Sequence, residues 1–289
     1  MNEKINQGML YVVATPIGNL GDLSARAREI LAKADVIAAE DTRHTARLLT
    51  HFGIRRPLLA CHDFNERERS EQIVERLQQG ECVALVSDAG TPLISDPGYH
   101  LVNAVRDADL KVVPVPGPCA MVAALSVSGL PSDRFFFEGF LPAKGSGRRK
   151  RIAELADFPH TWIVYESPHR IQDFLADMVT ELGSERRVVL ARELTKTFET
   201  VLSGSAGELQ QILIDDENQR RGEFVVLIQG AEKTDIADDG ISEEALRTLS
   251  ILIEELPMKQ ASQIAAKLTG LKPKLLYNAG LAMKAASSR

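Results

Sequence analysis

Cysteine is scarce in this 289-residue chain, and the three that occur are odd in number and widely spaced. They are Cys61, Cys82 and Cys119, and no C-x-x-C pair occurs among them. This pattern argues against a disulfide framework or a zinc site and favours reduced thiols. No apolar run approaches the ~18 residues that a membrane span needs, and the opening MNEKINQG lacks the apolar core of a signal peptide. We therefore expect a cytoplasmic protein without a membrane segment or a bound metal.

Several motifs that identify common binding sites are also absent. The chain has no G-x-x-x-x-G-K-[ST] phosphate loop, and its first glycine-containing loop, with Gly18 and Gly21, lacks the G-x-G-x-x-G spacing. No G-x-S-x-G nucleophile elbow occurs. His62, His100 and His160 lack the spacing of metal ligands. The sequence therefore argues against the usual nucleotide-binding loops, a serine hydrolase and a histidine metal centre.

Short apolar runs alternate with helical patterns along most of the chain. The runs predict buried strands at 9–14, 36–39, 58–61, 82–86, 112–115, 135–138, 162–165, 188–191, 200–203 and 224–228. Helices are predicted at 24–34, 66–79, 148–156, 171–182 and 206–214, with Ser24 as an N-cap and Gly80 as a C-cap. The alternation predicts a mostly parallel sheet with helices on both faces. The strands near 190 and 201 are close together, so the second half is expected to be mixed.

The organisation predicted from this pattern is two α/β lobes and a small helical domain. We place the first lobe at 1–120, the second at 121–232, a polar acidic linker at 233–240 and a helix-turn-helix-like domain at 241–289. A cleft between two lobes is a usual place for a small-molecule site.

Six unusual polar segments follow predicted strands directly. They are TPIGN at 15–19, EDTRH at 40–44, SDAGTPLISDPG at 87–98, PGPCA at 116–120, ESPHR at 166–170 and RELTK at 192–196. Ligands of open α/β sheets bind at the carboxyl ends of the strands, so we expect these loops to line one site. A pocket lined by proline and glycine without a phosphate-binding motif suits a cofactor held largely by backbone groups, such as an adenosyl compound.

The segments TPIGN, EDTR, SDAGTPLISDPG, PGPCA, YESPHR and ARELTK, in this order and spacing, resemble the tetrapyrrole-methylase superfamily of S-adenosylmethionine-dependent methyltransferases. The resemblance spans about residues 9–230 and continues into the tail. It is strongest to the branch that methylates the 2′-oxygen of a cytidine ribose in 16S rRNA. The tetrapyrrole members carry Gly-Asp-Pro where this chain has Ser87-Asp88-Ala89-Gly90, which argues against a porphyrin substrate.

This resemblance implies the class III methyltransferase fold, with S-adenosylmethionine in the cleft between two α/β lobes. It also implies a homodimer that acts on 16S rRNA or on the 30S ribosomal subunit. The residues that it assigns to the cofactor are Pro16, Gly18, Asp88, Thr91, Ile94, Cys119, Ala120, Tyr165 and Leu194. Cys119 stands where the family has serine, which weakens any hydroxyl contact at that position.

Methyl transfer to a ribose hydroxyl benefits from a base, because a sugar hydroxyl is a poor nucleophile at neutral pH. The strand-end loops offer Glu166, Glu193 and Lys196 as candidates. Each of the three also fits an ion pair at the end of a strand, and the sequence does not choose among them.

The basic residues are clustered although the net charge is −6. One cluster, expected to be flexible through Gly145 and Gly147, is predicted to bind RNA phosphates together with two residues of the 166–170 segment. The predicted RNA-binding residues are Lys144, Arg148, Arg149, Lys150, Arg151, His169 and Arg170. The alternative is an ordinary solvated face.

The tail after Leu256 holds five lysines, one arginine and no acidic residue. Its segments 260–270 and 271–277 resemble a helix-turn-helix that contacts RNA, or else a helical pair that docks or stabilises a dimer. Two other functions stay open: a small-molecule methylase of the same superfamily, and a non-catalytic RNA-binding regulator that uses the α/β body as a ligand sensor.

Overall fold

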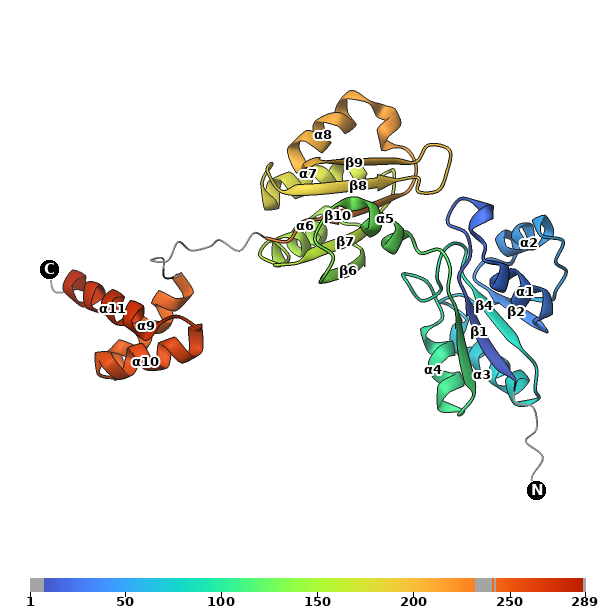
Figure 1. Ribbon diagram of the computed structural model, residues 1–289, viewed down its shortest axis with the longest axis horizontal. Coiled ribbons are helices and arrows are strands. Elements are labelled where there is room, and N and C mark those ends of the chain that lie inside the picture. The colour runs from blue at the N-terminus through green and yellow to red at the C-terminus, as the bar shows by residue number, and fades with distance from the viewer. Residues whose placement is uncertain (1–7, 232–240, 242, 288–289) are drawn as a thin grey trace, which may run out of the picture. The chain divides into compact units, whose positions relative to one another are not determined.

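A computed structural model describes residues 8–231, 241 and 243–287 (Figure 1). The chain divides into two compact units, residues 1–231 and 232–289. The predicted linker at 233–240 and the first seven residues of the opening segment lie outside the described residues. The three cysteines are free, and no helix of the described ranges is long and apolar enough to cross a membrane.

The first lobe is built on a parallel sheet in the order β3-β2-β4-β1-β5. Its strands are β1 (Met9–Val13), β2 (Val36–Ala39), β3 (Leu58–Ala60), β4 (Val83–Val86) and β5 (Lys111–Val115). The helices are α1 (Ala25–Lys33), α2 (Thr42–His51), α3 (Glu66–Gln78) and α4 (Tyr99–Asp107). Every residue of β2 and β4 is buried, as expected for strands covered on both faces.

Two hydrophobic clusters lie on opposite faces of this sheet, because successive strand residues point to opposite sides. Ile37 of β2 packs in the cluster that includes α1 and α2, whereas its neighbours Val36 and Ala38 pack in the cluster that includes α3 and α4. Figure 1 shows these helix pairs on the two sides of the sheet. Ser24 caps α1 as predicted, accepting a hydrogen bond from the Ala27 N–H at 3.0 Å.

The second lobe has a mixed sheet in the order β6-β7-β10-β8-β9. Its elements are β6 (Phe135–Phe140), β7 (Thr161–Glu166), β8 (Arg187–Arg192), β9 (Thr200–Ser205), β10 (Phe224–Ile228), α5 (Ala120–Ser128), α6 (Gly145–Glu154), α7 (Ile171–Leu182) and α8 (Ala206–Asp215). Only β6 and β7 pair in parallel; the other pairings are antiparallel, so the predicted mixed character is confirmed. Helix α5 packs on one face, and α6, α7 and α8 cover the other.

The C-terminal unit contains three helices in its described part, α9 (Glu243–Glu255), α10 (Met258–Thr269) and α11 (Pro273–Ser287). Leu249, Ala261, Ala265 and Leu276 are fully buried and form its core. Gly270 ends α10 with φ +72°, a left-handed conformation that glycine adopts without steric cost. The turn of the predicted helix-turn-helix therefore lies between α10 and α11.

All ten predicted strands and all five predicted helices are present. Helix α7 has the predicted bounds, and the ends of the other four helices differ from the prediction by one to three residues. Helix α6 begins at Gly145 instead of Arg148, and Gly80 follows the cap residue Gln79 of α3 with φ +91°. The sequence pattern did not identify α2, α4 and α5. The segment of α5, AMVAALSVS, is short and almost entirely apolar, so its periodicity does not distinguish a helix from a strand.

Candidate active site

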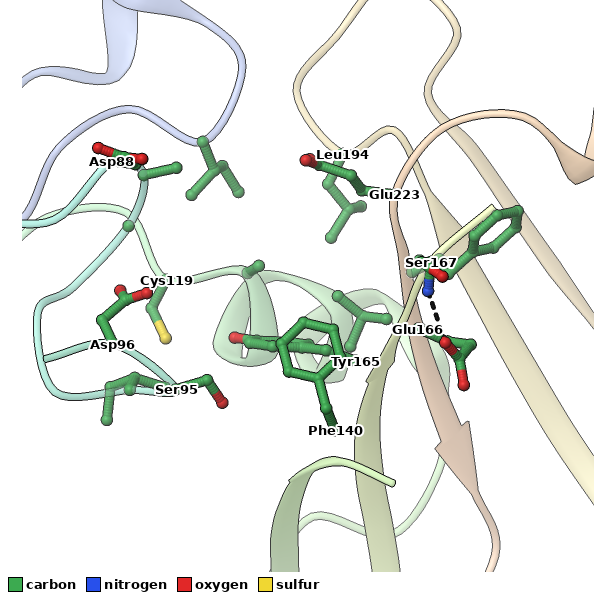
Figure 2. Close-up of a pocket in the computed structure, with 18 of the residues that line it drawn as sticks. Asp88, Ser95, Asp96, Cys119, Phe140, Tyr165, Glu166, Ser167, Leu194 and Glu223 are labelled. Carbon is green, nitrogen blue, oxygen red and sulfur yellow. Dashed lines mark hydrogen bonds between the residues drawn. The ribbon is translucent and has the colours of Figure 1, made fainter. Parts of the chain in front are cut away.

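A cavity of about 430 Å³ lies between the two α/β lobes and is lined by both of them (Figure 2). Its size is within the range of roughly 300–1,000 Å³ that is usual for small-molecule sites. Each of the six strand-end loops contributes to its lining; one lining residue from each is Ile17, Glu40, Asp88, Cys119, Glu166 and Glu193. The structure thus brings together the loops that the sequence pointed to.

Strand direction explains why loops of the second lobe converge. Both β7 and β8 run antiparallel to β10, so these two strands are parallel to each other and end at the same edge. Phe224, the first residue of β10, pairs with Glu166 on one side and with Arg192 on the other. Glu223, which directly precedes β10, therefore also lines the cavity.

Most residues assigned to the cofactor line this cavity. They are Asp88, Thr91, Ile94, Cys119, Ala120, Tyr165 and Leu194. Pro16 and Gly18 are not among the lining residues, whereas Ile17 between them is. A Cβ atom at Gly18 would lie 2.4 Å from Cγ of Lys196, so glycine there allows the first loop to approach the second lobe. The individual roles of these residues stay predictions.

Several lining residues were not selected from the sequence. Glu40, Ser95, Asp96 and Ser167 belong to the quoted strand-end segments but were not singled out within them. Two further lining residues, Phe140 at the end of β6 and Glu223 before β10, lie outside those segments.

Hydrogen bonds tie the loops of the first lobe together. Thr15 and Gly90 exchange two backbone hydrogen bonds, of 2.8 and 3.0 Å. The Thr91 hydroxyl donates to the Pro118 carbonyl at 3.0 Å. Asp88 Oδ1 accepts the Asp41 N–H at 3.0 Å. The 87–98 segment is thereby attached to the loops that follow β1, β2 and β5.

Backbone strain is concentrated around the cavity. Within the described ranges, five non-glycine residues have positive φ, and four of them lie in two cavity loops. These are Leu93 (+74°), Ser95 (+66°), Glu193 (+49°) and Thr195 (+65°). Each such conformation costs about 1–3 kcal/mol and persists only where the surrounding structure enforces it. This distribution is typical of a functional site.

The wall formed by the first lobe is acidic. Glu40, Asp88 and Asp96 all line it. Burial raises the pKa of Glu40, with a further increase from the Asp88 charge. Burial likewise raises the pKa of Asp96 to about 6, and the charges of Glu40 and Asp88 act in the same direction. This wall suits a cationic ligand, which would relieve the repulsion among the carboxylates.

On the second lobe, Glu193 and Lys196 form an ion pair. Lys196 Nζ lies 2.9 Å from Glu193 Oε1 and 2.8 Å from Glu223 Oε2, and the Glu223 N–H also donates to Glu193 at 2.9 Å. Burial acts to raise the pKa of Glu193, but the hydrogen bonds from Lys196 and Glu223 outweigh it, so this pKa is lowered. Burial acts to lower the pKa of Lys196, and its two carboxylate partners raise it. Both groups are therefore charged at neutral pH and engaged with each other, which makes either one a poor base.

The third predicted base, Glu166, is 2% exposed and also has partners. Its Oε1 accepts the Ser167 N–H at 2.7 Å, and its Oε2 lies 3.2 Å from Arg170 Nη2. The Oε2 contact is ionic only, because its geometry does not satisfy a hydrogen bond. Burial raises the pKa of Glu166, although Ser167 and Arg170 oppose the increase. Arg170 also donates to the carbonyls of Leu141 and Pro142, so this pair holds the segment before α6.

The predicted RNA-binding cluster is largely engaged in ion pairs. Arg148 is 5% exposed, and its Nε lies 2.7 Å from Asp177 Oδ2. Arg151 pairs with Glu138 at 2.7 Å and with Glu154 at 2.9 Å. Arg148 is therefore not available to a phosphate in this conformation, and the segment expected to be flexible forms the first turns of α6.

The remaining members of the predicted RNA-binding set are more accessible. Lys144, Lys150 and His169 are exposed, and Arg149 is exposed while it contacts Asp177 at 3.4 Å. None of the seven predicted residues lines the cavity. Within the described ranges, no group of three or more His, Cys, Asp or Glu residues is arranged to hold a metal ion.

Residues 9–210 match the family described as Tetrapyrrole (Corrin/Porphyrin) Methylases. The chain belongs to this family. Residues 239–284 match the RsmI C-terminal HTH domain, which agrees with the helix-turn-helix predicted in the tail. The family membership expected from the strand-end segments is thus confirmed.

Curated relatives of this methylase are similar over nearly their whole length. A protein of Pseudomonas aeruginosa described as Ribosomal RNA small subunit methyltransferase I is 55% identical over 277 residues, 96% of this chain and 98% of the relative. A relative of the same description from Xylella fastidiosa is 57% identical over 270 residues, 93% of this chain and 98% of the relative.

Solved structures confirm the expected class III methylase fold. The crystal structure of the methyltransferase CobJ matches with a TM-score of 0.57 at 20% identity, covering 78% of this chain and 95% of that chain. A uroporphyrin-III C-methyl transferase from Thermus thermophilus complexed with S-adenyl homocysteine matches with a TM-score of 0.52 at 17% identity, covering 76% of this chain and 97% of that chain.

Proposed function

We propose that this methyltransferase transfers a methyl group from S-adenosylmethionine to the 2′-oxygen of a cytidine ribose in 16S rRNA of the small ribosomal subunit. One observation supports rRNA as the substrate. More than half of the residues are identical to those of rRNA small subunit methyltransferases over nearly the full chain. The 2′-oxygen and the cytidine rest on the resemblance of the strand-end segments to that branch.

The charge of the cavity lining suits a sulfonium cofactor. S-adenosylmethionine carries a positive sulfonium and a positive ammonium group, and Glu40, Asp88 and Asp96 offer negative charge on one wall. Tyr165 offers an aromatic face to an adenine, and its hydroxyl is fixed by accepting the Met121 N–H at 3.1 Å. When bound, S-adenosylmethionine supplies an electrophilic methyl group.

The chain's own contribution is chiefly to hold the reactants in line. Alignment of an acceptor with an electrophile is worth about 7–11 kcal/mol in favourable cases. The strained backbone at Leu93, Ser95, Glu193 and Thr195 indicates that the surrounding structure holds the two loops that border the cavity. Lys196 stays protonated beside Glu193 and Glu223, which makes it a cation on the second wall and not a proton acceptor.

We propose that RNA approaches over the exposed basic residues of the second lobe, with the ribose splayed from its helix into the cavity. Lys144, Arg149, Lys150 and His169 are exposed and close in sequence to the cavity residues Phe140, Ser167 and Pro168. We also propose that the basic helices α10 and α11 contact the RNA.

The functional unit is proposed to be a homodimer in the cytoplasm. Helix α5 is apolar almost all round, yet its Val122 and Val127 are 54% and 55% exposed. Phe198, just before β9, is 70% exposed, and Val201, near the start of β9, is 39% exposed. Exposed apolar side chains on a helix that is hydrophobic all round are typical of a protein–protein interface, so they support contact with a second copy of the chain here. Sedimentation of the full chain tests the dimer.

The function is tested by incubation with S-adenosylmethionine labelled at the methyl group. The substrates are 30S particles, naked 16S rRNA and a porphyrin precursor, and label in the RNA is the expected result. Label in the porphyrin precursor alone would support the small-molecule alternative. The solved methyltransferase structures share the fold of this chain. No label in any substrate would support the non-catalytic regulator.

A further inference from the structure

Most carboxylates that line the cavity are held by a hydrogen-bond donor or a cation. They are Glu40, Asp88, Glu166, Glu193 and Glu223. Asp96 differs from all of them. Within the described ranges, its carboxylate forms no ion pair and accepts no hydrogen bond from an N–H group. The Ser87 hydroxyl is near it but also donates to the Ala89 carbonyl at 3.3 Å. Figure 2 shows Asp96 beside Cys119 on the wall opposite Glu166 and Glu223.

The backbone holds Asp96 in place from both sides. Ser95, directly before it, has φ +66°, and Gly98, shortly after it, has φ +131°. A Cβ atom at Gly98 would lie 2.9 Å from Leu93 Cδ1 and 3.0 Å from Leu85 Cδ2, so the chain is closely packed there. A Cβ atom at Gly139 would lie 3.2 Å from Ser95 Oγ, so this loop also reaches the second lobe.

Burial and the carboxylates that face Asp96 raise its pKa, so that its carboxylate can accept a proton close to neutral pH. Burial is the main cause that raises its pKa to about 6, and Glu40, Asp88 and Asp63 add to the increase from the loops after β2, β4 and β3. The Ser87 hydroxyl opposes it. The group of the second lobe that faces Asp96 is the Tyr165 phenol. Burial raises the pKa of this phenol, so it stays neutral.

We propose that Asp96 is the base that accepts the proton of the acceptor hydroxyl in methyl transfer. This proposal deepens the proposed function and rests on it. In the step, the acceptor oxygen forms its bond to the methyl carbon as the carbon–sulfur bond breaks, and that electron pair stays on sulfur. The hydroxyl proton passes to a carboxylate oxygen of Asp96 and is later released to water.

The charge of the methyl donor makes the ionisation of Asp96 depend on what is bound. A sulfonium in the cavity favours the ionised carboxylate, whereas the neutral thioether of S-adenosylhomocysteine does not. Donor binding therefore prepares the base, and product formation removes the charge that favoured its ionised form. At pH 6, where Asp96 is about half protonated, donor binding should release up to about half a proton more than product binding does.

The first experiment uses the full chain without RNA. Binding of S-adenosylmethionine and of S-adenosylhomocysteine is measured by calorimetry at pH 6 in two buffers of different ionisation enthalpy. We expect the two ligands to differ in proton release in the wild type and in Asp107→Asn, a matched control at an exposed residue of α4. The Asp96→Asn variant should lose that difference and bind S-adenosylhomocysteine within about threefold of the wild type.

The second experiment measures single-turnover methylation of 30S particles between pH 5.5 and 8.5. Asp96→Asn should lower the plateau rate by roughly 10²–10⁴-fold and remove the rise of the rate near pH 6. Glu166→Gln should keep that rise. An Asp96→Asn variant that keeps the rate and its pH dependence would overturn the proposal, as would a parallel loss of S-adenosylhomocysteine binding.

The two experiments separate failure of this proposal from failure of the proposed function. No label in 30S particles with the wild type would refute the RNA substrate. Equal proton release with donor and product in the wild type would refute the assignment of Asp96, whatever the acceptor is.

Discussion

The buried ion pair between Arg148 and Asp177 gives a prediction that separates stability from RNA binding. Arg148 Nε lies 2.7 Å from Asp177 Oδ2, and the two side chains are only 6% and 11% exposed. Removal of one partner from such a pair costs about 3–5 kcal/mol, because a charge is left buried without compensation. Arg149 contacts the other Asp177 oxygen at 3.4 Å and retains part of the compensation. We therefore expect Arg148→Met to lower the free energy of unfolding by about 2–4 kcal/mol.

Urea unfolding followed by tryptophan fluorescence measures this loss. Trp162 is the single tryptophan of the chain and is fully buried in the cluster that includes α6 and α7, so its emission reports on this lobe. Lys150→Met, an exposed change on the same helix, is the matched control and should stay within about 0.5 kcal/mol of the wild type. Replacement of both partners, Arg148→Met with Asp177→Leu, should recover part of the loss.

A different outcome would refute the structural role of Arg148. That outcome is an Arg148→Met variant as stable as the wild type whose affinity for 30S particles is reduced. Arg148 would then act on RNA, as its place in the basic cluster suggested from the sequence.

Three further changes test other parts of the structure. Gly18→Ala places a methyl group against Lys196, so it should weaken S-adenosylmethionine binding by about tenfold or more in calorimetry; unchanged binding would show that the two loops can separate freely. Asp96→Asn should raise the free energy of unfolding by about 1–2 kcal/mol at pH 8 and leave it unchanged at pH 4. The folded-state pKa of Asp96 is raised to about 6, so its contribution to stability is present below pH 4 and is lost as the pH rises through 6. Equal stability of the two proteins at pH 8 would contradict that shift. Tyr165→Phe removes the acceptor of the Met121 N–H and should cost about 0.5–1.5 kcal/mol in urea unfolding while cofactor affinity changes less than threefold; a tenfold loss of affinity would assign the hydroxyl to the ligand.

The fold was largely predictable because its strands are buried on both faces. A run such as Val83–Val86 is wholly apolar and flanked by polar loops, so it identifies a central strand without further information. The rule that ligands bind at strand carboxyl ends then identified the loops that line the cavity. Glu223 escaped it because it precedes an antiparallel strand, and the direction of β10 is a property of the sheet that local sequence does not encode.

The ion-pair and hydrogen-bond partners of the side chains could not be predicted from the sequence. Arg148 and Lys150 are two residues apart in one basic run, yet α6 directs the first into the lobe toward Asp177 and leaves the second exposed. Glu166 is the last residue of β7 and Glu193 directly follows β8. Hydrogen bonds nevertheless lower the pKa of Glu193, whereas burial raises that of Glu166. Asp96 lay within the quoted 87–98 segment, and its partial burial without a cationic or N–H partner became apparent only in the structure.

The identity of the methylated nucleoside tests the proposed methylation of a cytidine 2′-oxygen most directly. 30S particles from cells that lack this protein are incubated with the full chain and methyl-labelled S-adenosylmethionine, and the 16S rRNA is digested to nucleosides for mass spectrometry. We predict that the label appears as 2′-O-methylcytidine. Label found only in a base-methylated nucleoside, or no label in the RNA, would contradict the account.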